Sequence, residues 1–447
     1  MVTPVLKQVD KRISRQPLRT LVTILFLALA TSLIWLSRNA PKFKSGETPH
    51  WWPVILNVAY GRGYVACFPE NFPFCSSGNQ VTAQREPVPV LLFAAVARLT
   101  QESFWTITAV EIIINLMIVV GVYLLTRQLS DERVGLLAAL FWAVYLPAIR
   151  LVSQVSGDLL ATLGMVWGIY FFLRARQTTS AWDRVAAGII IGMATLSRSV
   201  IIAVAGALIV SLISWKQLIR YRSATAIAES LLPLALFAGS FTLTLLPWVV
   251  RNYVMFGEPL ITTLSGYNLY RHNYILLTDN YLRYVNGDEA LVAIKTLVAR
   301  HPDLQGDENE AQMDALYRSE AIRIILSEPV RYATLSAYRF FALWFDVGVS
   351  QAYGAPPTIL DKPIIAQQVI FLTLALLGLW QSWPRTWPLV TSIAVVTLMY
   401  IAVNSRLRYA IIAMPLVVVL AAIGALWLTR IAKKLFSLND RWQILWN

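Results

Sequence analysis

The chain alternates between long apolar runs and short polar segments, many of which are rich in Lys and Arg. An apolar run of about 17–25 residues predicts a helix that can cross a bilayer, and shorter runs can do so when neighbouring helices support them. The pattern predicts an all-α, polytopic transmembrane helical bundle with about ten spans. The ten segments are Thr20–Leu36, Phe104–Thr126, Val134–Ile149, Leu159–Leu173, Val185–Leu196, Val200–Ser214, Ala226–Val250, Ile364–Trp380, Trp387–Val403 and Tyr409–Thr429.

Two long polar stretches interrupt this series and predict large external loops. The first loop covers residues 38–103, and the second begins at Arg251 and ends near Asp361. Within the second stretch, Ala333–Phe345 is apolar but short and contains Arg339, so we expect an interfacial or re-entrant helix rather than a span. These boundaries predict three parts: an N-terminal transmembrane module with the first loop (1–250), an external lobe (251–362), and C-terminal transmembrane helices with a cytoplasmic tail (363–447).

Basic residues gather on one side of the predicted spans. The net charge is +13, although only 14% of residues are charged and 57% are hydrophobic. A basic cluster between Lys7 and Arg19 precedes the first span, and Arg430, Lys433 and Lys434 follow the last one. By the positive-inside rule both termini are cytoplasmic and the two long loops are external. We therefore expect a multi-pass inner (plasma) membrane protein surrounded by membrane lipids, and no nucleic-acid partner, because the polar segments are too short to read one.

Two cysteines, Cys67 and Cys75, lie close together in the first external loop. The external compartment is oxidising, so we expect a disulfide, with two free thiols as the alternative. A zinc site is not expected, because His50 is the only nearby histidine and the spacing fits no zinc pattern.

Two acidic residues are candidates for chemistry at the external face. Glu47 follows the first span closely, where a carboxylate could act as a general base or could simply be a solvated loop residue. Asp158 lies at the external end of the fourth predicted span, where it could also serve as a helix N-cap. The sequence contains no phosphate-binding loop, no dinucleotide fingerprint and no nucleophile elbow, and it shows no clear cluster of metal ligands.

Four arginines lie at the external ends of predicted spans, where the positive-inside rule does not require them. They are Arg198, Arg251, Arg406 and Arg408. A lone external arginine often anchors a helix at the interface. Four arginines at one face favour a site for an anionic lipid head group, because a guanidinium binds phosphate with two parallel hydrogen bonds.

Several short motifs occur in an informative order. They are Glu47, an amphipathic helix ending in Gly61-Arg62-Gly63-Tyr64, Arg85-Glu86-Pro87-Val88-Pro89, the run from Gly188 to Arg198, Pro247-Trp248 through Arg251-Asn252-Tyr253, and Arg408-Tyr409-Ala410-Ile411 before Pro415. In this order the motifs resemble the GT-C superfamily of integral membrane glycosyltransferases. The resemblance is to its branch of protein mannosyltransferases, aminoarabinose transferases and related bacterial envelope enzymes.

The resemblance implies transfer of a sugar from a polyprenyl-phosphate donor to an envelope acceptor (lipid, glycan or protein) on the external face of the membrane. An acid in the first external loop would act as general base on the acceptor hydroxyl. Glu47 takes that place, but the family usually has Asp there, so Glu86 and Asp158 are alternative catalytic acids. The candidate ligands of the carrier phosphate are Arg198, Arg251, Arg406 and Arg408. No cofactor is certain, and the participation of a divalent metal ion, which some relatives are thought to use, is left open.

Two other functions compete with this interpretation. A transporter or flippase for a lipid-linked glycan intermediate would use the same arginines without needing an acid beside them, and it would more often show internal repeats, of which none is evident. An O-antigen-ligase-like or assembly protein within a glycan pathway is the other alternative.

Overall fold

The computed structural model describes residues 15–39, 47–75, 80–212, 224–304, 306, 308–345, 361–383 and 385–444. Throughout these ranges the regular elements are helices, and the one extended pairing is an isolated antiparallel bridge between Val65 and Val81. The predicted all-α class is therefore confirmed.

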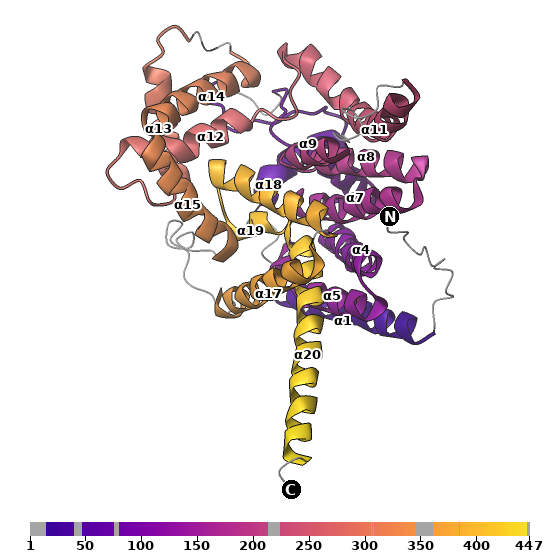
Figure 1. Ribbon diagram of the computed structural model, residues 1–447. Coiled ribbons are helices and arrows are strands. Elements are labelled where there is room, and N and C mark those ends of the chain that lie inside the picture. The colour runs from indigo at the N-terminus through magenta and orange to yellow at the C-terminus, as the bar shows by residue number, and fades with distance from the viewer. Residues whose placement is uncertain are drawn as a thin grey trace.

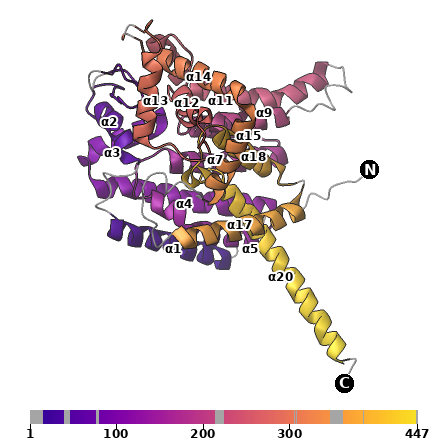
Figure 2. The same ribbon diagram turned by 90° about the vertical axis from the view of Figure 1, so that its left-hand side faces the viewer.

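The helices form three groups in chain order. The first group contains α1 (Arg15–Asn39), α2 (Thr48–Ala59), α3 (Pro87–Thr100), α4 (Phe104–Leu129), α5 (Glu132–Ala143), α6 (Leu146–Leu151), α7 (Asp158–Thr178), α8 (Ala181–Thr195), α9 (Ile201–Leu212) and α11 (Ala224–Phe256). The second group contains α12 (Ser265–Asn273), the 3-10 helix η2 (Tyr274–Leu277), α13 (Gly287–Ala299), α14 (Glu310–Ser327) and α15 (Pro329–Phe345). The third group contains α17 (Asp361–Ser382), α18 (Trp387–Val403), α19 (Leu407–Ala410) and α20 (Met414–Ile444). In Figures 1 and 2, α12, α13 and α14 form a lobe at the side of the molecule opposite α1, α5 and α17.

Each of the ten apolar segments overlaps at least one helix, but the helices differ in their capacity to cross a membrane. Among the described residues, six helical segments are both long and apolar enough to do so: Gln16–Asn39, Phe104–Leu129, Asp158–Thr178, Leu231–Phe256, Asp361–Ser382 and Met414–Ala432. Three further apolar helices are shorter: Pro87–Thr100, Ile201–Leu212 and Trp387–Val403. The count of about ten spans stays a prediction.

The segment predicted as one span over Val134–Ile149 is divided in two. Its α5 half ends at Ala143, and α6 begins at Leu146. Pro147 has no N–H with which to continue the helical hydrogen bonds, so the chain breaks before it. Gln367 of α17 satisfies the broken backbone: its amide nitrogen donates to the carbonyl oxygen of Val144 (2.9 Å), and its amide oxygen accepts from the N–H of Leu146 (3.0 Å).

The α17 and α20 helices pack with their backbones in contact. A Cβ at Gly378 would lie 1.9 Å from the carbonyl oxygen of Leu420, and a Cβ at Gly424 would lie 2.0 Å from that of Leu374. Small residues permit such close approach in membrane helix pairs, where packing supplies much of the association energy. The N-terminal part of α20 is buried in the bundle, while its C-terminal part extends well beyond the other helices (Figure 1).

The first loop is closed locally and tied to the lobe. Cys67 and Cys75 form the predicted disulfide, with their Cα atoms 5.6 Å apart. Buried Glu310 of α14 accepts hydrogen bonds from the backbone N–H of Ala83 (2.9 Å) and from the side chain of Gln84 (3.1 Å). The two large external loops predicted from the sequence therefore pack against each other.

The segment Ala333–Phe345 is helical and belongs to α15, which is not among the helices long and apolar enough to cross a membrane in the described ranges. Its arginine, Arg339, is 4% exposed and donates to Asn273 (3.1 Å) and to the carbonyl oxygen of His272. These bonds tie α15 to α12 within the lobe. The position of this helix relative to the membrane stays a prediction.

We expect Gly378→Ala to destabilise the protein, because its methyl group would overlap the backbone of α20. Overpacking of this kind costs about 1–3 kcal/mol. The matched control is Gly239→Ala in α11, where a Cβ would meet nothing within 4 Å, so alanine should be neutral or slightly stabilising. Thermal unfolding of both variants in detergent measures the difference, and equal unfolding temperatures would show that the glycine contact does not matter.

Candidate active site

Four of the charged residues predicted from the sequence meet in one buried cluster, although they come from four separate segments of the chain. Glu47 immediately precedes α2, and Asp158 is the first residue of α7. Arg198 lies in the connection between α8 and α9, and Arg408 lies in the short helix α19. We call these four residues the charge cluster.

Asp158 is the centre of the charge cluster. Its side chain is 0% exposed, and one carboxylate oxygen, Oδ1, accepts a hydrogen bond of 2.7 Å from Nε of Arg198. The other oxygen, Oδ2, lies 3.2 Å from Nε of Arg408 and accepts a 3.2 Å hydrogen bond from the hydroxyl of Ser156. A carboxylate with these partners is held in one orientation, and it fixes both guanidinium groups in turn.

Glu47 completes the charge cluster through an ion pair between its Oε1 and Nη1 of Arg408. Both side chains are nearly buried, at 19% and 18% exposure. Burial by itself raises the pKa of Glu47, but the charge and hydrogen bond of Arg408, helped by the charges of Arg198 and Arg85, outweigh it and leave this pKa well below its ordinary value. Glu47 is therefore ionised at neutral pH and, while it is paired, is a weak base.

Close backbone packing brings Asp158 and Arg198 together. A Cβ at Gly157 would lie 2.1 Å from the carbonyl oxygen of Ser197, so only glycine allows the start of α7 to approach the end of α8 this closely. Trp51 of α2 is fully buried against the same point, and its ring lies 5.6 Å from the guanidinium carbons of both Arg198 and Arg85. The indole thus supports the arginine side of the cluster through cation–π contacts.

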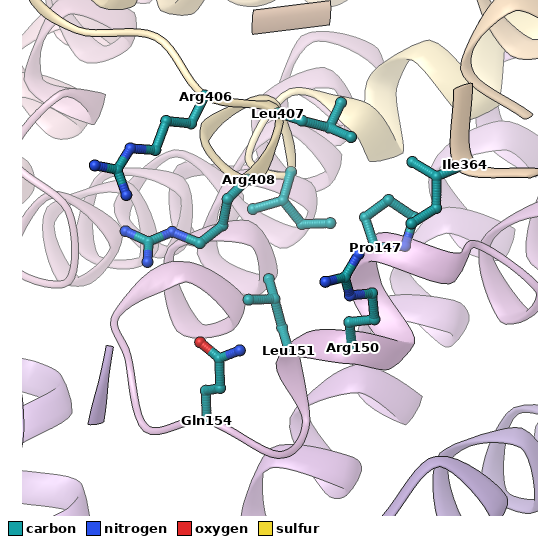
Figure 3. A pocket seen from close by; sticks show the side chains of 9 residues that line it. Pro147, Arg150, Leu151, Gln154, Ile364, Arg406, Leu407 and Arg408 are labelled. Carbon is teal, nitrogen blue, oxygen red and sulfur yellow. The ribbon is translucent and has the colours of Figure 1, made fainter. Parts of the chain in front are cut away.

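Arg406 and Arg408 line a pocket of about 210 Å³ that adjoins the charge cluster. Figure 3 shows their guanidinium groups lying beside each other on one side of this pocket. Gln154, which also lines the pocket, accepts from the backbone N–H of Glu47 at 3.5 Å. The pocket also has a large apolar share, formed by Pro147, Leu151, Ile364, Leu407 and Ile411. Positive charge beside apolar surface suits an amphiphilic anion.

The remaining two predicted residues have other contacts. Glu86 is buried, and its carboxylate accepts a hydrogen bond from the backbone N–H of Ser199 (3.0 Å). It therefore stabilises the backbone next to Arg198. Arg251 donates to the backbone carbonyl oxygens of Thr82 (2.9 Å) and Tyr64 (3.3 Å) and therefore ties α11 to the first loop. The structure gives neither residue an ion pair with the charge cluster.

Several residues of the site were not singled out from the sequence. Arg150 of α6 lines the pocket, and Gln154, Trp51 and Gly157 support the cluster. The motif Gly157-Asp158 could have indicated a close backbone contact beside an acid. Nothing in the sequence around Arg150 distinguishes it from an interfacial anchor.

The charge cluster is a poor fit for a divalent metal ion. The carboxylates of Glu47 and Asp158 already bind guanidinium groups, which would repel a metal cation. In the described part of the chain, no three His, Cys, Asp or Glu side chains gather as metal ligands. A metal ion at Glu47 and Asp158 would require both arginines to move away.

We expect Asp158→Asn to destabilise the protein by about 3–5 kcal/mol, because it leaves the guanidinium of Arg198 without its carboxylate and Arg408 with Glu47 alone. The matched control is Asp131→Asn. Asp131 forms an exposed ion pair with Arg430 at 3.5 Å, and asparagine can still cap α5. Chemical or thermal unfolding in detergent compares the two substitutions, and similar losses would contradict a special role for the buried carboxylate.

Comparison with known proteins places this geometry in a known fold. Residues 84–241 match the family described as dolichyl-phosphate-mannose-protein mannosyltransferase. A search of curated proteins finds no match.

Solved structures provide a more extensive match. The oligosaccharyltransferase AglB from Archaeoglobus fulgidus, in complex with an inhibitory peptide and a dolichol-phosphate, is 16% identical with a TM-score of 0.56, over 96% of this chain and 52% of that one. Its apo form is 15% identical with a TM-score of 0.54, over 95% of this chain and 52% of that one. ArnT from Cupriavidus metallidurans, bound to undecaprenyl phosphate, is 12% identical over 90% of this chain and 76% of that one, but its TM-score of 0.34 is too low to support a structural comparison.

The chain spans about half the length of the oligosaccharyltransferase chains that it matches. The overlap covers nearly all of this chain. The family match and the shared architecture confirm the resemblance seen in the sequence, and the chain shares its fold with this oligosaccharyltransferase.

Proposed function

We propose that this protein is a glycosyltransferase that takes a sugar from a polyprenyl-phosphate-linked donor and transfers it to an envelope acceptor. The observation that carries this proposal is the charge cluster, in which the carboxylate of Glu47 contacts an arginine that also lines an amphiphilic pocket. The match to the mannosyltransferase family supports it, as does the dolichol-phosphate bound to a structural neighbour.

The donor would bind with its phosphate at the arginines and its isoprenoid chain along the apolar wall of the pocket. A guanidinium can offer two parallel N–H donors to phosphate oxygens, and Arg408 would do so by giving up its pair with Glu47. The apolar residues of the pocket would hold the first part of the lipid chain. A guanidinium is always charged at physiological pH, so this side of the site needs no proton transfer to bind an anion.

Glu47 would act as the general base. It takes the proton of the acceptor hydroxyl while the acceptor oxygen forms a bond to the anomeric carbon of the sugar. The bond from that carbon to the phosphate oxygen breaks, and the electron pair leaves with the carrier phosphate, which gains one negative charge. The arginines stabilise this charge as it develops. Asp158 would hold Arg198 in position and keep Arg408 near the pocket rather than exchange protons itself.

Arg408 links donor binding to the strength of the base. It binds Glu47 and Asp158 and also lines the pocket, so a donor phosphate competes with Glu47 for the same guanidinium. When Arg408 turns toward the phosphate, the pKa of Glu47 rises toward its ordinary value. The carboxylate then becomes a better proton acceptor at the stage when the acceptor needs one.

The disulfide supports an external location for this chemistry. Cys67 and Cys75 are in the same loop as Glu47, and disulfides persist in oxidising compartments. Together with the basic clusters at both ends of the chain, this favours cytoplasmic termini and an external active face.

Replacement of Glu47 tests the base. We expect Glu47→Gln to reduce sugar transfer from a labelled polyprenyl-phosphate sugar by about 10²–10⁴-fold, the usual contribution of a general base. The control is Glu102→Gln, because Glu102 belongs to the same loop but bonds to Tyr60 at 2.6 Å. Full transfer by the Glu47 variant would rule out this base, and movement of the lipid-linked sugar without any transfer would favour the transporter alternative.

The pH profile tests the link through Arg408. The profile of kcat/KM reports the free enzyme, in which Glu47 has a lowered pKa and stays ionised well below its ordinary titration range. The profile of kcat reports the donor complex, in which Arg408 is shared with phosphate. We therefore expect the acid limb of kcat to lie at higher pH than that of kcat/KM, and coincident limbs would contradict the competition for Arg408.

A further inference from the structure

Arg150 lines the same pocket as Arg406 and Arg408, but it comes from a different part of the chain. It lies on α6, the short helix created by the break at Pro147. Figure 3 shows Arg150 across the pocket from Arg406, with Leu151 and Arg408 between them. The pocket thus has positively charged side chains on two sides, which is more than an interfacial anchor would require.

The present partner of Arg150 holds it weakly. Its Nη1 lies 4.0 Å from Oδ1 of Asp361, the first residue of α17, and the two side chains are 40% and 33% exposed. An ion pair this long and this open contributes little, since exposed pairs are worth about 0–1 kcal/mol. The buried pair of Arg198 and Asp158 at 2.7 Å is much tighter. Arg150 can therefore exchange its carboxylate for another anion at small cost.

Arg408 can offer only part of its positive charge to the phosphate. Arg408 is shared with two carboxylates, Glu47 and Asp158. A carrier phosphate binds as a diester and leaves with one additional negative charge. A guanidinium on the far side of the pocket, with a partner that is easily displaced, is suited to neutralise that charge.

We propose that Arg150 is a further ligand of the carrier phosphate and that Asp361 holds it in place until the donor binds. This inference rests on the proposed function. It adds a binding residue. It also requires a lipid donor whose anionic head group lies between α6 and α17. Asp361 then acts as a competitor of the phosphate for Arg150.

A purely structural role for the Arg150–Asp361 pair makes different predictions. If the pair only tied α6 to α17, removing either partner would have the same effect on stability and no specific effect on ligand affinity. If Asp361 competes with phosphate, removing Asp361 and removing Arg150 must change affinity in opposite directions.

The test uses the full chain in detergent and undecaprenyl phosphate as the probe, with affinity measured by calorimetry or native mass spectrometry. We expect Arg150→Ala to weaken binding about tenfold, a typical loss for one charge-assisted hydrogen-bonded contact. Asp361→Asn should strengthen binding several-fold, and Arg150→Lys should recover part of the loss. The matched control is Arg174→Ala, which removes a similarly exposed arginine paired with Asp183 at 3.2 Å on a different part of the bundle.

Two further probes separate this inference from the proposed function. Undecaprenol has the chain without the phosphate, and inorganic phosphate has the charge without the chain. If the wild-type protein does not prefer undecaprenyl phosphate to undecaprenol, the proposed function itself fails. If the wild type shows that preference but Arg150→Ala and Asp361→Asn leave the affinity unchanged or shift it in the same direction, only the role of Arg150 is overturned. Unfolding temperatures of the variants confirm that any loss of affinity is not a loss of fold.

Discussion

The structure depends on the burial of two carboxylates and two guanidinium groups at a point where four separate segments meet. Each charge would be costly to bury alone, and the four together are neutral. Asp158 and Arg198 are held by the contact of Gly157 with Ser197, and Glu47 and Arg408 are brought in by α2 and α19. The first loop, the bundle and the C-terminal helices must therefore all be in place for any of these charges to be satisfied.

The burial of these charges also links the stability of the fold to the proposed proton transfer. Asp158 has the most partners in the cluster, since it is fully buried and bound on both oxygens. Glu47 is more exposed and has Arg408 as its ion-pair partner, so it is the carboxylate that can be released. In the proposed mechanism, Asp158 therefore holds the arginines in place and Glu47 is available for proton transfer. The difference follows from burial and from the number of partners rather than from residue type.

Much of the fold could be predicted because apolar runs and their flanking charges act locally. Each of the ten segments overlaps a helix, and the disulfide formed where two nearby cysteines share a loop. The division of Val134–Ile149 was not predicted, because a proline in an apolar run can either kink a span or end it. Here Gln367, which is remote in sequence, binds both ends of the break. The number of spans and the position of α15 in the membrane are still predictions from the sequence.

The sequence by itself determined that this chain is helical, suited to a membrane, and charged at unusual places beside its apolar segments. Glu47, Asp158, Arg198, Arg406 and Arg408 could be named as candidates because charge is expensive where they occur. Only the tertiary structure decided which of these charges contact one another, and it gave Glu86 and Arg251 supporting contacts elsewhere. It also added Arg150, whose place at the pocket depends on a helix break and on α17. Which distant segments contact one another depends on how the whole chain packs. Residue types and local spacing do not determine this.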